Sequence, residues 1–127
     1  IMKKYLLKLL LAVVIFVAID APWILLVVTP LYNNSISAIM RAEPVLLPAV
    51  LFYFIYIAVL LYITKGLPSK KAGITAFLFG IAAYATFTLT NMSVLEGWNW
   101  GLVVGDILWG GFLTFATYKI TSLIIKD

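Results

Sequence analysis

Four long runs of apolar residues constrain this chain more than any other feature of its sequence. The runs cover residues 9–28, 45–64, 73–90 and 102–123. A helix needs about 20 apolar residues to cross the hydrocarbon core of a bilayer. Hydrophobic residues make up 65% of the chain and charged residues 11%, whereas soluble domains average about 45–50% and about 25%. The sequence therefore predicts an all-α membrane protein, with one integral membrane domain over residues 1–127 and a bundle of four transmembrane helices.

The basic residues indicate how these spans are oriented. If the first span starts in the cytoplasm, all eight lysines fall on the cytoplasmic side and only Arg41 lies outside. The lysines are Lys3, Lys4, Lys8, Lys65, Lys70, Lys71, Lys119 and Lys126. Cytoplasmic loops of membrane proteins carry such an excess of basic residues. The sequence therefore predicts a multi-pass protein of the cell inner (plasma) membrane with both termini in the cytoplasm.

The start of the first run, Met2-Lys3-Lys4 followed by apolar residues, resembles a signal peptide. The run continues past Asp20 to residue 28, and no small-x-small cleavage site ends it. We therefore expect the first helix to be retained in the protein.

The first outer connection has an amphipathic pattern. Over residues 31–43, apolar side chains such as Tyr32, Ile36 and Met40 recur at helical spacing, with polar side chains between them. This pattern predicts a short helix lying on the outer surface of the membrane. It could be a simple spacer or a lid over a cavity. Trp98, in the second outer connection, is expected to anchor the chain at the interface.

Two acidic residues, Asp20 and Asp106, lie inside apolar spans. A carboxylate at the bilayer centre costs roughly 2.5–3.5 kcal/mol, so such residues usually face the interior of a bundle or water. From the helical rise, Asp20 lies about 12 Å and Asp106 about 6 Å below the outer surface. Pro22 removes a backbone hydrogen bond beside Asp20, which is expected to kink the helix. Both acids are therefore predicted to face inward, in the outer half of the membrane.

Other polar and aromatic residues fall at a similar depth. Trp23 and Trp109 each follow an acid by one helical turn, and a polar stripe marks one face of the third span. Together these residues predict an outward-facing pocket that holds a ligand or a proton. The candidate residues are Asp20, Trp23, Tyr53, Tyr56, Tyr84, Thr88, Asn91, Asp106 and Trp109. The same side chains could instead cross-link the helices by hydrogen bonds, and this structural alternative stays open.

Small residues also recur along the third and fourth spans. Ala76, Gly80, Gly105, Gly110 and Gly111 would let helices approach closely, and packing is their favoured interpretation.

Histidine and cysteine are absent from the sequence. Their absence excludes disulfides, Ser-His-Asp triads and the usual ligands of zinc, haem and iron–sulfur clusters. No cofactor and no metal site is predicted. The basic residues lie at the ends of the spans and not in a patch, so nucleic acid is not an expected partner. The expected partners are membrane lipids and a small-molecule or lipid ligand.

Several motifs together resemble a known family. They are Leu51 to Tyr56 (LFYFIY), Asp20 with Trp23, Leu89-Thr90-Asn91 with Gly97-Trp98, and Asp106-x-x-Trp109-Gly110. In this order they are similar to small bacterial inner-membrane proteins known only as domain of unknown function 2177. The resemblance covers essentially the whole chain. It implies four membrane helices and carries no established activity or cofactor.

Three classes of function remain open at this point. The acids and aromatic residues suit a protein that binds or moves a small molecule, a lipid or a proton, and aromatic faces beside an acid suit an organic cation. A lipid-modifying enzyme could use the two carboxyls as general acid and base. However, no nucleophile–base pair and no phosphate-binding loop is recognisable. The third class is a structural or accessory membrane protein.

Overall fold

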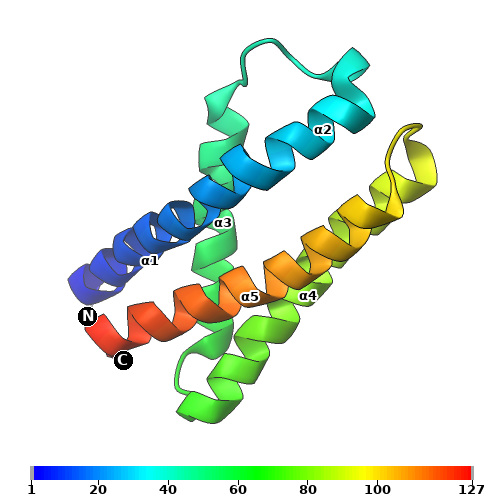
Figure 1. The fold of residues 1–127 in the computed structure, drawn as a ribbon. Helices are drawn as coiled ribbons and strands as arrows, with labels where there is room; N and C mark the ends of the chain where they lie inside the picture. Colours follow the sequence, from blue (N-terminus) through cyan, green and yellow to red (C-terminus); the bar gives the residue numbers. More distant parts are fainter. Residues whose placement is uncertain (1, 127) are drawn as a thin grey trace.

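The computed structural model describes residues 2–126, so the two outermost positions of the expected domain lie outside the described residues. The described chain is all-α and has four helices long and apolar enough to cross a membrane. The last three are α3 (Leu46–Thr64), α4 (Ser69–Val94) and α5 (Trp100–Ile124), as Figure 1 shows. The first covers Met2–Ile39 and is made of several segments. Each of the four predicted spans is therefore a helix.

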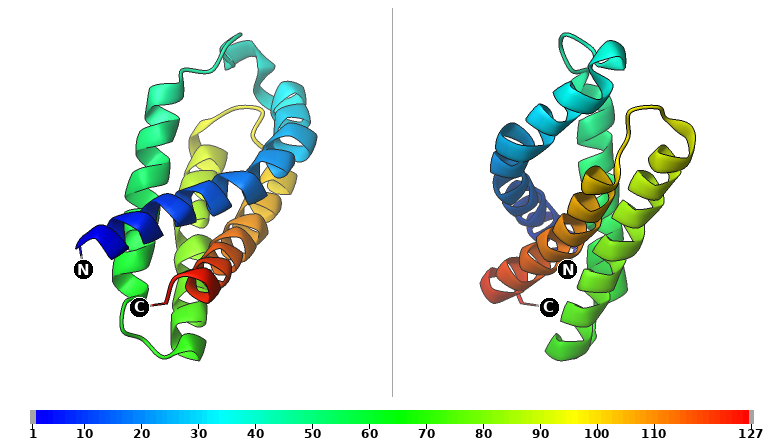
Figure 2. Two further views of the ribbon diagram at one scale, coloured as in Figure 1. Left: turned by 90° about the vertical axis from the view of Figure 1, so that its left-hand side faces the viewer. Right: turned by 45° about the vertical axis from the view of Figure 1, so that its right-hand side comes forward.

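The first membrane helix is irregular after its proline. It consists of α1 (Met2–Trp23), a π-helical turn (Ile24–Val28), α2 (Thr29–Ile36) and a 3-10 turn (Ser37–Ile39). Pro22 has no N–H to donate, and its ring conflicts with the carbonyl one turn earlier. The π-helical turn begins two residues after Pro22. Its Thr29 N–H donates to the Ile24 carbonyl, five residues earlier, whereas an α-helix bonds residues four apart. The helix changes direction between α1 and α2, as Figure 2 shows.

The separate surface helix expected over residues 31–43 is not shown within residues 2–126. Leu31 to Ile36 continue the first helix as α2, and residues 40–45 are not helical. Pro30, which suggests a helix end in the sequence, lies in the first turn of α2, where a missing N–H costs little. The helical spacing of Tyr32 and Ile36 thus belongs to an extension of the first span.

The two ends of the molecule differ in charge. Both described chain ends and the α3–α4 connection (65–68) lie at one end, whereas residues 40–45 and the α4–α5 connection (95–99) lie at the other (Figures 1 and 2). All eight lysines therefore gather toward the first end, which we call the lysine end. The opposite end carries Arg41, Glu43 and Glu96, and these three side chains are exposed.

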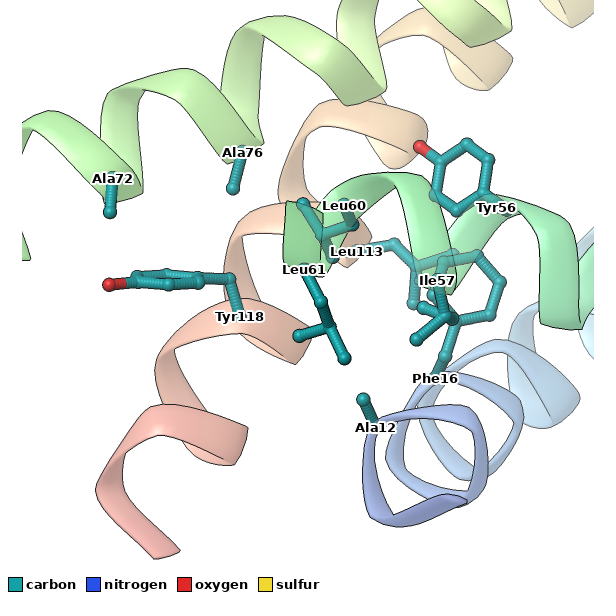
Figure 3. Packing of buried hydrophobic residues seen from close by; sticks show 10 residues of the cluster. All are labelled: Ala12, Phe16, Tyr56, Ile57, Leu60, Leu61, Ala72, Ala76, Leu113 and Tyr118. Atoms are coloured by element: carbon teal, nitrogen blue, oxygen red, sulfur yellow. The ribbon is translucent and has the colours of Figure 1, made fainter. Parts of the chain in front are cut away.

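The apolar core joins α1, α3, α4 and α5. Phe16 of α1, Ile57 and Leu60 of α3 and Leu113 of α5 are fully buried. The Phe16 ring packs edge-on against Tyr53, with 5.7 Å between ring centroids. Figure 3 shows how side chains from these helices meet. This packing holds α1 and α3 beside the α4–α5 pair. Tyr53, Tyr84 and Trp109 pack against the same core.

Helices α4 and α5 pack closely because glycines line their contact. A Cβ atom at Gly80 would overlap the Gly110 carbonyl, and one at Gly110 would overlap the Tyr84 side chain. A Cβ at Gly111 would press on Ile81 and Phe77. The packing role predicted for these glycines is therefore present, and the backbone of α5 lies directly against α4.

Candidate functional site

The two intramembrane acids line the same cavity. Asp20 near the end of α1 and Asp106 near the start of α5 both border a cavity of about 260 Å³. The Asp20 and Asp106 side chains are only 7% and 8% exposed. The residues around the cavity lie in the half of each helix away from the lysine end. Two carboxyl groups that are 86 positions apart in the sequence thus border one cavity.

The cavity wall is aromatic and carries no basic group. Its residues are Asp20, Trp23, Ile24, Val28, Tyr32, Phe52, Tyr53, Tyr84, Phe87, Asp106 and Trp109. None of these described wall residues is lysine or arginine. The protein therefore places no cation within the wall to neutralise the two carboxyl groups. The faces of tryptophan, tyrosine and phenylalanine rings attract cations through their negative electrostatic potential.

Asp20 is held by a tryptophan pair. The Trp109 indole N–H donates to the Asp20 Oδ1 over 2.8 Å, which joins α5 to α1. The Trp109 ring stacks on Trp23 with 4.5 Å between ring centroids and only 6° between their planes. Gly105 lies beside this stack, and a Cβ there would be 3.9 Å from the Trp23 ring. This contact fixes the Asp20 carboxyl and leaves its second oxygen, Oδ2, for other partners.

Asp106 is only partly satisfied by the protein. Its Oδ2 is buried and has no hydrogen-bond partner among residues 2–126. The Thr88 hydroxyl lies beside the Asp106 carboxyl, and the same hydroxyl accepts a hydrogen bond of 3.1 Å from the Trp98 indole N–H. Buried polar atoms are normally hydrogen-bonded, so an orphaned carboxyl oxygen is an unusual feature. It leaves one oxygen of a cavity-lining carboxyl group without a partner in the described chain.

The end of the cavity away from the lysines is covered. Trp98 of the α4–α5 connection is buried and packs against Tyr32 and Phe87, with ring centroids 5.2 Å and 5.8 Å away. Gly97 has a φ of 87°, and a Cβ at this position would overlap the Ser35 carbonyl of α2. The Asn99 amide donates to the Ser35 hydroxyl over 3.0 Å. The α4–α5 connection therefore packs against α2 and is hydrogen-bonded to it at the end of the cavity away from the lysines.

A hydrogen-bonded pair joins α3 and α5 next to the cavity wall. The hydroxyls of Tyr56 in α3 and Thr114 in α5 are 2.6 Å apart and buried. Thr114 gives its hydrogen to the Gly110 carbonyl, so the hydroxyl of Tyr56 donates to Thr114. The Tyr56 ring also packs edge-on against Tyr84, which lines the cavity. Tyr56 is thus committed to holding α3 against α5.

The nine residues selected from the sequence are distributed in three ways. Six line the cavity, namely Asp20, Trp23, Tyr53, Tyr84, Asp106 and Trp109. Tyr56 and Thr88 are buried just behind the wall and contact it. Asn91 is not among the wall residues and lies near the end of α4, where its carbonyl accepts from the Leu95 N–H. Whether the cavity holds a ligand or a proton stays a prediction.

Five wall residues were not selected from the sequence. The sequence pattern predicts Tyr32 in a surface helix, and Phe52, Phe87, Ile24 and Val28 look like ordinary lipid-facing residues in an apolar span. The π-turn brings Ile24 and Val28 to the wall, and such turns occur often at functional sites. For Phe52, the signal available was its place beside Tyr53 in the aromatic motif.

The described residues offer no cluster for a metal ion. No group of three or more histidine, cysteine, aspartate or glutamate side chains comes together within residues 2–126. The two carboxyl groups with tyrosine hydroxyls nearby can instead exchange protons or accept hydrogen bonds from a ligand.

Comparisons with known proteins place the chain in a family. No curated protein and no solved structure matches the chain. The family described as predicted membrane protein (DUF2177) matches residues 5–123, which is nearly the whole length. The resemblance seen in the sequence motifs is therefore confirmed, and the chain belongs to the DUF2177 family of predicted membrane proteins.

Proposed function

We propose that this membrane protein binds a small organic cation in the cavity between Asp20 and Asp106. The observation that carries the proposal is the pair of buried carboxyl groups in an aromatic cavity without a basic residue in its described wall. A carboxyl group away from water is costly to ionise unless a positive charge lies beside it, and otherwise it tends to keep its proton. A cation in the cavity would balance this charge, and aromatic rings would surround its apolar groups.

The size of the cavity favours a small ligand. Its volume of about 260 Å³ lies just below the range of about 300–1,000 Å³ typical of drug-sized ligands. Protons should compete with the cation for the two carboxyl groups. A cation binds the ionised carboxyl groups, so lowering the pH should weaken its binding by protonating them. Binding or movement of a small cation would then be coupled to proton uptake or release.

The test uses choline as the probe, because its charge does not change with pH. Isothermal titration calorimetry of the purified protein in maltoside micelles should detect choline binding that weakens as the pH falls. The matched control ligand is the uncharged isostere in which carbon replaces the choline nitrogen, and we expect it to bind at least about tenfold more weakly. Equal binding of both ligands, or no choline binding between pH 5 and pH 9, would contradict the proposal.

A structural role is the competing interpretation. The hydrogen bonds from Trp109 to Asp20 and from Tyr56 to Thr114 each join two helices, which favours it. However, a cross-linking role does not account for the unpartnered Oδ2 of Asp106.

The proposed orientation places the lysine end in the cytoplasm and the acid cavity in the outer half of the plasma membrane. The chain contains no cysteine, so single cysteines can report on each end without background. A membrane-impermeant maleimide should label the Arg41→Cys variant in intact cells, but should label Lys70→Cys only after the cells are permeabilised. The cysteine-free protein is the control. Labelling of Lys70→Cys in intact cells would reverse the orientation.

A further inference from the structure

A second cavity adjoins the acid cavity on the side of α3 and α4. It has a volume of about 440 Å³ and is lined by Phe52, Tyr56, Ala83, Tyr84 and Phe87. Phe52, Tyr84 and Phe87 also line the acid cavity. Three aromatic side chains therefore border both cavities.

The chemistry of the second cavity differs from that of the acid cavity. No charged residue is among its described lining residues. The hydroxyl of Tyr56 is already bonded to Thr114, so it is committed to the protein. The remaining surface consists of aromatic rings and the methyl group of Ala83. This cavity suits a hydrocarbon chain, whereas the acid cavity suits a charged group.

The shared aromatic residues also reach the outside of the helix bundle. Phe52 is 42% exposed and Phe87 is 49% exposed, and in a membrane the neighbours of such side chains are lipid chains. By contrast, the end of the acid cavity away from the lysines is covered by Trp98 and by the Asn99–Ser35 hydrogen bond. A lateral approach to the acids between α3 and α4 is therefore lined by side chains that border both cavities.

We propose that the two cavities form one elongated site for a single-chain cationic amphiphile, which enters from the bilayer between α3 and α4. Its positively charged head would lie between Asp20 and Asp106, and its alkyl chain would lie along Ala83 and the shared aromatic residues. This inference rests on the proposed binding of a cation and adds the class of ligand and its route.

The first test compares two ligands on the unaltered protein. Ethyltrimethylammonium carries the head alone, and octyltrimethylammonium adds an alkyl chain. Binding is measured in maltoside micelles, and partitioning into empty micelles is subtracted, because any alkyl chain enters a micelle without the protein. After this correction, we expect the octyl compound to bind at least about tenfold more tightly. Equal corrected affinities would overturn the elongated site and leave cation binding intact.

The second test blocks the chain site alone. Ala83 lines the second cavity but not the acid cavity, so Ala83→Phe should remove the advantage of the octyl compound and change ethyl binding by less than about twofold. The matched control is Ala82→Phe, at an exposed neighbouring position on α4 outside both cavities. An octyl advantage that survives Ala83→Phe would contradict the inference. Failure of both ligands to bind the unaltered protein would instead contradict the proposed function itself, and the first test decides the matter if Ala83→Phe does not fold.

Discussion

Replacing Asp106 or Asp20 with asparagine is expected to weaken choline binding by about 10- to 100-fold while the protein stays folded. The range follows from the strength of interactions with a charged partner, about 1.5–3 kcal/mol, at about 1.4 kcal/mol per factor of ten. An amide keeps the size of the carboxyl group but cannot carry its negative charge. The remaining pH dependence of binding should also become smaller, because one titrating group has been removed.

The stability of these variants should change little. At Asp20, an asparagine oxygen can still accept the hydrogen bond from Trp109. Hydrogen bonds between membrane helices average roughly 0.6 kcal/mol, so a small change in geometry there is tolerable. At Asp106, one carboxyl oxygen has no partner in the described chain that could be lost. Thermal unfolding in maltoside micelles, followed by circular dichroism, measures this directly.

The control variants for the acids come from the same chain. Glu43→Gln and Glu96→Gln each remove one negative charge at exposed positions away from the cavity wall. Both should bind choline as the unaltered protein does. If either aspartate variant unfolds outright, the acids are structural cross-links. If both keep full, pH-dependent choline binding, the acids do not hold the cation.

The sequence was sufficient to find the two acids and much of the cavity wall. Charged residues in apolar spans are rare and costly, so Asp20 and Asp106 stood out without any structure. One helical turn after each acid, Trp23 and Trp109 share its face, and the structure stacks these two rings on each other. These predictions needed only the number of helical turns that separate two residues.

The rest of the wall depended on information that a helical repeat does not contain. Thr88 and Asn91 lie on one face of α4, yet only Thr88 lies beside the Asp106 carboxyl. Thr88 also accepts a hydrogen bond from Trp98, which inserts from the α4–α5 connection. The sequence predicts Trp98 as an interface anchor and does not indicate that its side chain is buried in the protein, where it is 6% exposed. Such a contact is set by how a connection folds back, and hydropathy does not encode this.

The sequence also does not predict where the first helix ends. Pro30 and the asparagines after it favour a break, and the amphipathic spacing of residues 31–43 favours a second helix. The π-turn at Ile24–Val28 changes the phase of the helix, so α2 carries Tyr32 onto the cavity. A one-residue change in helical phase turns every later side chain by about 100°, which no periodicity argument anticipates.

Replacing Gly110 with alanine is expected to lower both the stability of the protein and its affinity for choline. The added methyl group would overlap Cβ, Cγ and Cδ1 of Tyr84, and the atoms nearest the backbone of Tyr84 have little freedom to move. Inserting a methyl group into a packed interior typically costs about 1–3 kcal/mol. Because Tyr84 lines the acid cavity, pushing it away from α5 would also deform the binding site.

The neighbouring glycine provides the matched control. Gly111→Ala adds the same methyl group to the same helix and gains the same helix propensity, about 1 kcal/mol. Its methyl group would press on the Ile81 Cδ1 and Phe77 Cε1 atoms, which lie at the far ends of side chains that can rotate. Ile81 and Phe77 are also absent from the wall residues of the acid cavity. We therefore expect Gly110→Ala to unfold at a lower temperature than Gly111→Ala and to be the only one of the two with weakened choline binding. Equal losses in both variants would mean that Tyr84 does not transmit the packing of α4 and α5 to the cavity.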